Sequence, residues 1–516
     1  MKRSKGNYKK SIFMFDKRTF LMLFLLSFLS VSCKTIPPNS TEKKPNIIFI
    51  MADDLGWKDV SFMGSNWFET PNLDKLAKES MVFNQAYMYP TCSPSRAALL
   101  TGKQSFRTGV YTVPVLEKGN NQTDIFSRWT VGLEHPVYAK PLNEAGYKLI
   151  HLGKWHIVGP NPRSETKHPF EKKLKQPDNG DMSWVTDLKD PEIQKYYPKG
   201  RGFHENVGGS WWGDPAKGHT KGYKSESGGY NAPFKNPMIE PKDSDEWLTD
   251  RLTDEAIDFI DRNKDEPFFV NLHFYSPHRP FKVRNKEMMK KFRSKIANLN
   301  TKLAENKLKG VAAYATMIAS IDENIQRIVD YLDEKGLREN TIIVFTSDNG
   351  YSGVRSARDR LRGAKGFIYE GGIRVPALVN WRGKIKPGRT ETPISGLDYF
   401  PTFLELAGVN NYKELLDGES IVPLLKGKQF NERPLFWHVA STYRNPPCSV
   451  IRKGDFKLIQ FLNDGKVELY DLEKDVKESK NLLKEKPEIA KALLEELTTW
   501  RKENKVPLPP ASSLLF

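Results

Sequence analysis

Cysteine is the residue that this sequence uses least: Cys33, Cys92 and Cys448 are the only three in 516 residues. Three cysteines exclude a fold held by a disulfide framework. The sequence also lacks zinc-finger spacing and an RNP-type aromatic pattern, so nucleic acid is not an expected partner. One cysteine nevertheless stands in a distinctive stretch, "CSPSRAALLTGK" from Cys92 to Lys103, beside a proline and an arginine.

Acidic residues are few relative to basic ones. The chain has 63 Asp and Glu against 80 Lys and Arg, a formal net charge of +17. Residues 1–32 carry seven of the basic residues and one acidic residue, so residues 33–516 keep a net charge of +11. This excess favours anionic partners such as sulfated or acidic glycans or lipid headgroups, although a lysine-rich solvated surface accounts for part of it.

One charge-free apolar run stands near the N-terminus, between Phe20 and Cys33, after a basic opening. The run is too short to span a bilayer comfortably, and the layout predicts a secretory signal over residues 1–33. Its end, "SVSC", resembles a bacterial lipoprotein processing site with Cys33 as the lipidated residue, although Leu29 lies one place earlier than usual. We therefore expect an exported lipoprotein, periplasmic or on the outer membrane or cell surface, with residues 34–45 as a linker; ordinary cleavage or a retained anchor are the alternatives.

Three apolar runs of β-type composition each end in polar residues suited to chemistry. The runs and the residues that follow them are 45–51 with Asp53 and Asp54, 341–346 with Asp348 and Asn349, and 267–274 with His278. Continuous apolar strands are typical of a parallel sheet covered on both faces, and ligand sites in such sheets lie beyond the carboxyl ends of the strands. We expect the three ends to converge.

Helical periodicity occurs between these runs, over residues 70–81, with Thr70 at the N-cap position, and over 248–263 and 314–336. The alternation predicts an α/β fold, a large sheet sandwiched by helices, over residues 46–427. Short antiparallel strands and a terminal helix over 428–516 predict a smaller α+β subdomain. The segment 159–242, rich in Gly, Pro, Lys, Trp and Tyr, is typical of an ordered binding loop.

The acidic pairs allow two interpretations. Asp53, Asp54, Asp348 and Asn349 offer only oxygen donors, which suit a hard divalent cation such as Ca²⁺ or Mg²⁺ better than zinc. Each pair alone is more typical of a turn or a helix cap. Their positions after two apolar strands favour the metal site enough to keep both interpretations open.

The Cys92 thiol allows three interpretations: a small buried hydrophobic group, a thiolate nucleophile, or a modified residue. Arg96 lies four residues on, and on the same helix face if a helix starts at Pro94, where it can hold an anion close to Cys92. The residues alone favour core packing.

The surroundings change that preference, because several blocks together resemble the type I, formylglycine-dependent sulfatase family of the alkaline phosphatase superfamily. They are the signature Cys-X-Pro-Ser-Arg followed by Leu-Thr-Gly, "ADD", "GKWH" at 153–156, "SPHRPF" at 276–281, "SDNG" at 347–350 and "LRGAKGFIYEGGIRVP" at 361–376. The set spans most of the chain in this order. His204 departs from the pattern, because related sequences often have an acidic residue after the preceding Gly-Phe.

The resemblance implies an alkaline-phosphatase-like fold and a role for each residue. Cys92 would be oxidised to Cα-formylglycine by a formylglycine-generating enzyme, and its hydrate would supply the nucleophilic oxygen. A metal ion, most simply Ca²⁺, would be bound by Asp53, Asp54, Asp348, Asn349 and the modified Cys92. Arg96 would steady the hydrate, and Lys154 and Lys365 would hold sulfate oxygens. His156 would accept a proton, and His278 would be the general acid, with Lys365 as the alternative acid.

The expected substrate is a sulfated glycan outside the cytoplasm, such as algal ulvan, a glycosaminoglycan or a mucin, attacked from a chain end. Trp211, Trp212 and Tyr230 are candidates for stacking on sugar faces, with loop packing as the alternative. Two rival functions stay open: a phosphonate or phosphate ester hydrolase of the same superfamily, and a non-catalytic glycan-binding lipoprotein in which Cys92 is never oxidised.

Overall fold

The computed structural model describes residues 43–512, except 121, 160–189, 216–228, 235, 237, 353–359 and 511. The described residues from Lys44 onward form one compact unit. The predicted signal, the lipidation site Cys33 and most of the predicted linker lie outside the described residues. Among the residues that are described, none of the helices combines the length and apolar character needed to cross a membrane.

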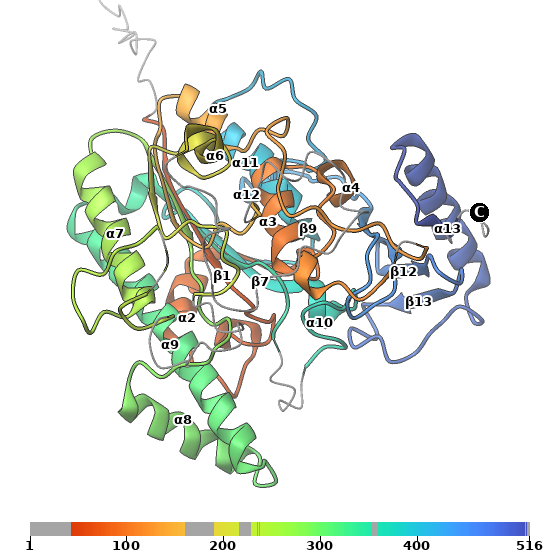
Figure 1. The fold of residues 1–516 in the computed structure, drawn as a ribbon, viewed down its shortest axis with the longest axis horizontal. Helices are drawn as coiled ribbons and strands as arrows, with labels where there is room; N and C mark the ends of the chain where they lie inside the picture. The colour runs from red at the N-terminus through yellow and green to blue at the C-terminus, as the bar shows by residue number, and fades with distance from the viewer. Residues whose placement is uncertain are drawn as a thin grey trace, which may run out of the picture. The chain divides into compact units, whose positions relative to one another are not determined.

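The large sheet has nine strands in the order β4-β3-β5-β1-β6-β7-β2-β8, with β9 paired to β2 (Figure 1). They are β1 (Asn46–Ala52), β2 (Ser80–Tyr87), β3 (Lys148–Gly153), β4 (Glu205–Val207), β5 (Phe268–His273), β6 (Thr341–Ser347), β7 (Arg374–Asn380), β8 (Gly388–Thr390) and β9 (Ile394–Ser395). Only β7 pairs antiparallel with its neighbours, β6 and β2. The three predicted strands are therefore confirmed as β5, β1 and β6, side by side and parallel.

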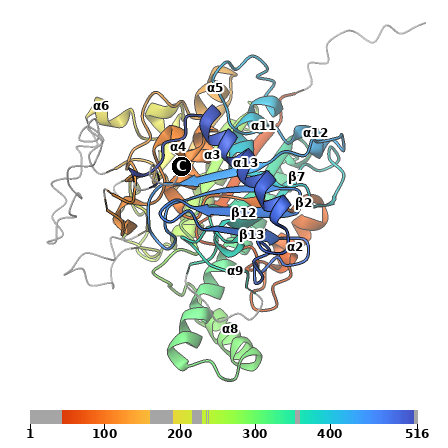
Figure 2. The same cartoon turned by 90° about the vertical axis from the view of Figure 1, so that its right-hand side faces the viewer.

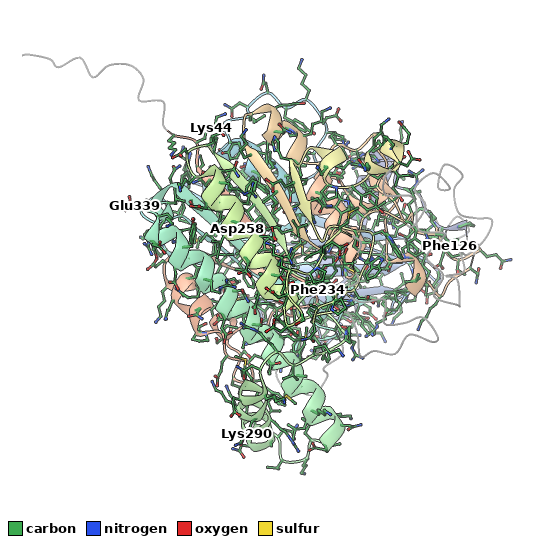
Figure 3. The ribbon with its side chains drawn as sticks, turned by 60° about the vertical axis from the view of Figure 1, so that its left-hand side comes forward. Lys44, Phe126, Phe234, Asp258, Lys290 and Glu339 are labelled. Carbon is green, nitrogen blue, oxygen red and sulfur yellow. The ribbon has the colours of Figure 1, made fainter. Side chains whose placement is uncertain are left out.

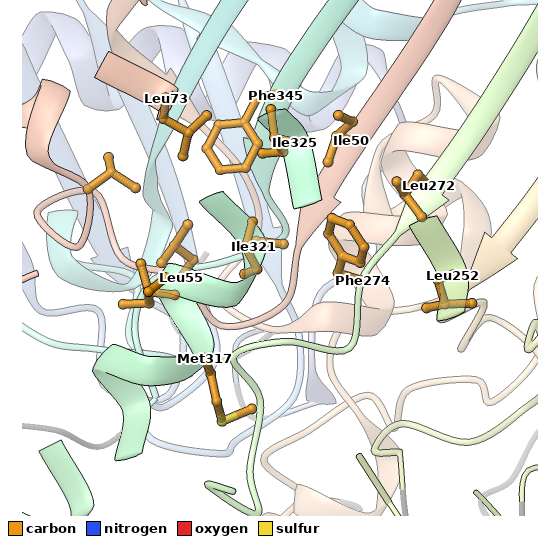
Figure 4. Packing of buried hydrophobic residues seen from close by; sticks show 14 of the residues in the cluster. Ile50, Leu55, Leu73, Leu252, Leu272, Phe274, Met317, Ile321, Ile325 and Phe345 are labelled. Atoms are coloured by element: carbon orange, nitrogen blue, oxygen red, sulfur yellow. The ribbon is translucent and has the colours of Figure 1, made fainter. Parts of the chain in front are cut away.

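Alternate side chains of each central strand enter two separate cores. In β1, Ile48 and Ile50 pack with the cluster shown in Figure 4, which includes residues of helices α7 (Leu248–Asn263) and α9 (Glu305–Glu334). Ile47 and Phe49 pack into the core on the opposite face. Burial on both faces explains why the strand sequences are continuously apolar rather than alternating.

Helices cover both faces of the sheet, as the α/β prediction required. The longer ones, besides α7 and α9, are α2 (Pro71–Lys78), α3 (Cys92–Thr101), α5 (Ala139–Glu144), α8 (Lys286–Leu299), α11 (Tyr399–Leu406) and α13 (Pro487–Glu503), and the four-residue helices are α4 (Ser105–Thr108), α6 (Pro191–Gln194), α10 (Glu370–Ile373) and α12 (Val422–Leu425). The prediction for α7 is confirmed residue for residue, whereas α9 begins nine residues earlier than the predicted start at 314.

Helix α2 begins as predicted, with Thr70 at the N-cap position and Pro71 as its first residue, but it ends earlier than predicted. The Thr70 side chain makes no capping bond, because its hydroxyl pairs with Ser61 instead. The helix ends at Lys78 rather than at residue 81, since β2 begins at Ser80 and Met81 pairs with Val379 of β7. Strand pairing therefore overrides the helical periodicity at this boundary.

A second, antiparallel sheet follows near the C-terminus, in the order β10-β11-β12-β13. Its strands are β10 (Leu435–Val439), β11 (Cys448–Lys453), β12 (Phe456–Phe461) and β13 (Val467–Asp471). Helix α13 lies across one face, as Figure 2 shows, with Leu493 and Leu497 in the core between them. Side chains on the other face pack against residues that precede β7, including Ile368 and Ile373.

Candidate active site

Four adjacent parallel strands bring the predicted site residues to one edge of the sheet. In the spatial order β3, β5, β1, β6, the strands end at Gly153, His273, Ala52 and Ser347. Lys154, His278, Asp53 with Asp54, and Asp348 with Asn349 follow these ends. The predicted convergence is thus confirmed, and it follows from parallel pairing alone, since the carboxyl ends of parallel strands share an edge.

Cys92 is the first residue of α3, where backbone amides and the helix dipole favour negative charge. The Ser95 hydroxyl holds the preceding turn, accepting from the Tyr89 amide at 3.0 Å and donating to the Thr91 carbonyl at 2.9 Å. The side chain of Cys92 is buried, and burial raises the pKa of its thiol although Lys154 and Lys365 act in the opposite direction. The unmodified thiol is therefore a poor nucleophile.

Among the residues that the structure describes, three buried oxygens at this edge have no hydrogen-bond partner: Asp53 Oδ1, Asp54 Oδ2 and Asn349 Oδ1. Asp53, Asp54 and His278 each place a ligand atom within 4.8 Å of the others. Buried oxygens without partners are costly unless a cation satisfies them. The residues present therefore fit a hard divalent cation, although the clustered group includes His278, which the sequence prediction did not place among the metal ligands.

Both carboxylate oxygens of Asp348 accept hydrogen bonds, unlike the oxygens of Asp53, Asp54 and Asn349. Its Oδ2 accepts from Arg96 Nη2 at 2.9 Å and from Nε at 3.1 Å, and its Oδ1 accepts from the Asp54 amide at 3.1 Å. Burial, together with the charge of Asp53, raises the pKa of Asp348 to about 6. Arg96 also donates to the Lys154 carbonyl at 2.8 Å, so this guanidinium ties α3 to the ends of β3 and β6.

Two lysines face the carboxylates. Lys154 Nζ lies 2.6 Å from Asp53 Oδ2, and Lys365 Nζ lies 2.7 Å from Asp54 Oδ1. Burial by itself would lower the pKa of Lys365, but the Asp54 charge outweighs it and raises that pKa. Burial likewise opposes ionisation of Asp54, whose pKa Lys365 and His278 nevertheless hold below its usual range. The Lys365 ammonium therefore stays charged near neutral pH.

Two histidines, His156 after β3 and His278 after β5, complete the set of predicted site residues. His156 adopts a left-handed backbone with φ of 56°, its carbonyl accepts from Ser93 Oγ at 3.2 Å, and burial takes its pKa well below the usual value. His278 Nδ1 lies 2.7 Å from the Arg279 carbonyl, which leaves Nε2 facing Asp54 Oδ2 at 3.6 Å. Burial lowers the pKa of His278 to about 3.

Sequence reasoning missed the side chains that hold Asp54 in its left-handed backbone, with φ of 65°. The Tyr314 hydroxyl donates to the Asp54 carbonyl at 3.0 Å and to Asp59 Oδ2 at 2.7 Å. Arg360 pairs with Asp59 at 2.9 Å. A non-glycine residue in this conformation costs on the order of 1 kcal/mol, so its neighbours must impose it. None of the three supporting residues belongs to a quoted sequence block.

The segment that carries Lys365 is fastened to the C-terminal sheet. Lys457 of β12 donates to the Ile368 carbonyl at 2.9 Å and pairs with Glu370 and Glu478 at 3.0 and 2.9 Å. The Glu370 amide donates to Glu478 Oε2 at 2.7 Å. No local pattern indicated this buried triad, because its three members are distant in the chain and only Glu370 belongs to a quoted sequence block.

Several aromatic and histidine candidates lie outside the cluster. Tyr230 is fully buried and donates to the carbonyls of Tyr275 and His278, so loop packing, the alternative to sugar stacking, describes it. Trp211 and Trp212 are buried in the core on one face of the sheet. His204 accepts from the Leu149 amide at the sheet edge, and His273 inside β5 lies 3.3 Å from Arg96 Nη1. Much of the segment 159–242 lies outside the described residues.

Two protein-family models and several known proteins are similar to this chain. The model of the sulfatase family matches residues 45–409, and that of the "N-sulphoglucosamine sulphohydrolase, C-terminal" region matches residues 363–503. A sulfatase of Formosa agariphila is 30% identical, with 94% of this chain and 93% of the relative covered. An N-acetylglucosamine-6-O-sulfatase of Bacteroides thetaiotaomicron is 29% identical, with 94% and 91% covered.

The fold agrees with solved structures as well. The structure of Ps i-CgsB in complex with k-i-k-neocarrahexaose has a TM-score of 0.66 and 28% identity, covering 89% of this chain and 93% of the other. The family match spans the strand ends, Cys92 and Lys365, and the second match joins the Lys365 segment to the sheet that anchors it. The chain belongs to the sulfatase family and is a sulfuric ester hydrolase with an alkaline-phosphatase-like fold.

Proposed function

We propose that this enzyme removes sulfate esters from an extracytoplasmic glycan, with a formylglycine made from Cys92 and a bound Ca²⁺ ion. The observation that carries the proposal is the placement of Cys92 at the N-terminus of α3, amid three buried oxygens without partners and the two lysines Lys154 and Lys365. A nucleophile, a cation site and anion-binding groups are the parts that sulfuryl transfer needs.

The electrostatic balance of the cluster supports a bound cation. Arg96, Lys154 and Lys365 match the charges of Asp53, Asp54 and Asp348, so the cluster is neutral without an ion. A divalent cation makes it net positive, which favours the sulfate monoester anion and the charge that develops on its oxygens. Mg²⁺ is the alternative ion, since it accepts the same oxygen donors but demands stricter geometry.

Each side chain of the site has a separate role in the proposed reaction. Formylglycine supplies, as its hydrate, the oxygen that attacks sulfur. Lys154 and Lys365 hold the sulfate oxygens, and Arg96 holds the residue-92 end of α3 through its bonds to Asp348 and the Lys154 carbonyl. His156, neutral because its pKa is lowered, accepts the proton whose removal lets sulfate leave and the aldehyde re-form.

We assign the general acid to His278, with Lys365 as the alternative, and infer that the negative charge of the bound sulfate ester raises the low pKa of His278 so that Nε2 carries a proton. A sugar alkoxide is a poor leaving group and needs a proton, whereas nitrophenolate does not. His278→Ala should therefore lose activity on a sugar sulfate by about 100-fold or more while keeping most activity on nitrophenyl sulfate. If His278→Ala lowers both activities equally and Lys365→Ala shows the selective loss, the assignment passes to Lys365.

The names of relatives support a glycan substrate. The Bacteroides relative acts on N-acetylglucosamine 6-sulfate by its name, and a solved structure at 28% identity holds a carrageenan-type oligosaccharide by its title. We infer an oligosaccharide of a sulfated polysaccharide such as ulvan, carrageenan or a glycosaminoglycan, cleaved of sulfate at a chain end. Sulfate release from a panel of defined oligosaccharides, each with one sulfate at a terminal or an internal sugar, tests both the sugar and the exo action.

The decisive experiment for the chemistry is mass spectrometry of the peptide containing Cys92, after co-expression with a formylglycine-generating enzyme. Conversion lowers the peptide mass by about 18 Da, and free sulfate should then appear from at least one glycan. Cys92→Ala serves as the matched control, because it leaves the fold intact but cannot be converted. An unmodified thiol with glycan binding and no sulfate release would instead identify a glycan-binding lipoprotein.

Export and lipidation form a separate proposal. We infer that Cys33 carries a lipid after signal removal, so that the enzyme works in the periplasm or at the cell surface. Labelled palmitate should enter the wild-type protein and not Cys33→Ala. Absence of label from the wild type, with a mature N-terminus at another residue, would identify ordinary cleavage.

A further inference from the structure

The positive charge of this protein is concentrated in one short region. Residues 279–309 contain eleven Lys and Arg and two Glu, a net charge of +9, whereas residues 33–516 as a whole carry +11. The basic residues are spaced by apolar and polar ones, so no uninterrupted run marks the region. Its charge therefore accounts for most of the excess, and the rest of the protein is close to neutral.

This region, here called the basic hairpin, consists of the segment after His278, helix α8 and the first residues of α9. Phe292 and Ile296 of α8 pack on Leu308 and Val311 of α9, which makes it an ordered element. Figure 1 shows α8 and the start of α9 projecting from the large sheet.

The basic hairpin lies on the same side of the fold as the active site. In Figure 3, Lys44 and Glu339, which precede strands β1 and β6, lie at one end, and Lys290 of α8 lies at the other. The hairpin therefore projects in the direction in which these parallel strands end, and their ends carry the site. The chain itself passes from His278 through exposed Arg279 into the hairpin.

Many charges of the hairpin have no acidic partner in the structure. Arg284 pairs with Asp250, Lys291 with Glu69, and Arg293 with Glu305. Within the described part of the chain, no ion pair is formed by the exposed side chains of Arg279, Lys286, Lys290, Lys302, Lys307 and Lys309. Unneutralised cations on one projecting element repel each other and favour a multivalent anion.

A cavity of about 490 Å³ at the base of the hairpin does not suit an anion, because Glu69, Glu287 and Glu323 are among its lining residues. An anionic partner would therefore meet the outer, lysine-bearing faces of α8 and α9. A long polyanion can contact several lysines there at once, whereas a small sulfated sugar in the active site cannot.

We propose that the basic hairpin is a second binding surface for the sulfated polysaccharide, which holds stretches of the anionic chain outside the active site. The proposal rests on the proposed glycan substrate and adds to it a polymer carrying many sulfates or carboxylates. The contacts are electrostatic and solvent-exposed, so each is weak and salt-sensitive, and binding grows with the number of charges that the chain presents.

The test compares two charge-matched variants of the full chain. The hairpin variant carries Lys286→Gln, Lys290→Gln, Lys307→Gln and Lys309→Gln, and the control carries Lys477→Gln, Lys484→Gln, Lys491→Gln and Lys502→Gln, all exposed lysines near or in α13. Glutamine has nearly the helix propensity of lysine, so both should fold. Calorimetric titration with dextran sulfate at several salt concentrations gives the affinity and its salt dependence.

We expect the hairpin variant to bind dextran sulfate about tenfold more weakly, with a smaller salt dependence, and the control to bind within about twofold of the wild type. Equal weakening in both variants would overturn the proposal. So would unchanged dextran sulfate binding in a hairpin variant that no longer binds phosphatidylglycerol vesicles, which would identify a membrane surface.

Turnover separates this proposal from the proposed function. Sulfate release from a monosulfated oligosaccharide should be the same in the wild type and the hairpin variant, whereas kcat/KM on the polymer should fall in the variant. If no glycan yields sulfate while the wild type still binds dextran sulfate through the hairpin, the proposed function fails and the binding surface stands.

Discussion

The ammonium of Lys457, on β12 of the C-terminal sheet, lies 3.0 Å from the carboxylate of Glu370, five residues beyond the active-site Lys365. Lys457 also holds Glu478 and the Ile368 carbonyl, and all three charged side chains of this triad are buried. The C-terminal sheet thus contributes to the active site without supplying a residue to it, because it fixes the backbone on which Lys365 is mounted.

Lys457→Met should lower both stability and turnover. Removing the cation leaves two buried carboxylates without their partner, which costs about 3–5 kcal/mol of unfolding free energy. The Lys365 segment also loses its attachment, so kcat should fall about tenfold or more. Urea unfolding and steady-state kinetics measure the two effects on the same preparation.

Conservative variants separate positioning from folding. Lys457→Arg keeps the charge and should retain most of the stability. Adding Glu370→Gln and Glu478→Gln to Lys457→Met removes the unpaired charges and should restore stability without restoring kcat, since the bond to the Ile368 carbonyl stays absent. Recovery of kcat together with stability would show that Lys457 acts on folding alone.

Gly213→Ala should impair His156 without unfolding the protein. A methyl group at residue 213 would lie 2.4 Å from His156 Nε2, so the imidazole must shift. Displacement of a catalytic group by about 1 Å can cost about 100-fold in rate. Gly310→Ala in α9, where a methyl group meets no atom within 4 Å, is the matched control and should keep full activity. Comparable kcat in both variants would contradict a role for His156 in turnover.

Much of the fold could be predicted from the sequence, because the central strands can be recognised from their local sequence alone. The runs that became β1, β5 and β6 are continuously apolar and end in polar residues, and parallel pairing then forces those residues together. The amphipathic spacing of α7 likewise predicted its bounds. The resemblance to sulfatases supplied what spacing could not, namely the significance of Cys92.

The features of the site that the sequence did not predict depend on contacts between residues that are distant in the chain. The Tyr314 hydroxyl of α9 contacts the Asp54 carbonyl, and Lys457 of the C-terminal sheet contacts the segment that carries Lys365. No local sequence pattern predicts either contact. For Tyr230 the sequence left sugar stacking and loop packing equally open, and the fold buries the side chain. Burial is a property of the assembled fold, and composition does not determine it.

The stability of helix α2 should depend on pH through Asp322. This side chain of α9 accepts from the amides of Leu73 and Asn72 at 2.7 and 3.2 Å, and so caps α2 in place of Thr70. Burial, outweighing those bonds, raises the pKa of Asp322 from 3.8 to about 6. The folded state therefore binds a proton that the unfolded chain releases, and this stabilisation is complete below pH about 4 and lost as pH rises through about 6.

Asp322→Asn cannot ionise, so the difference in unfolding free energy between wild type and variant should shrink as pH rises from about 5 to about 7.5. Denaturant unfolding across that range measures it. Glu323→Gln, at the neighbouring half-buried carboxylate that pairs with Arg284, is the control and should not reproduce the trend. A difference that grows with pH would mean that Asp322 is stabilised as the carboxylate.

Calcium should stabilise the folded protein, because Asp53 Oδ1, Asp54 Oδ2 and Asn349 Oδ1 are buried without partners. A ligand that binds only the folded state at 100 times its Kd adds about 2.7 kcal/mol, so the thermal midpoint should rise with Ca²⁺ and fall with a chelator. Mg²⁺ at the same concentration should raise it less, since it tolerates irregular oxygen sites poorly. Asp54→Asn should abolish the shift, whereas Asp258→Asn, an exposed carboxylate on α7, should retain it. This measurement needs no turnover and no conversion of Cys92, so a full calcium shift in Asp54→Asn would place the cation elsewhere whatever the activity of the preparation.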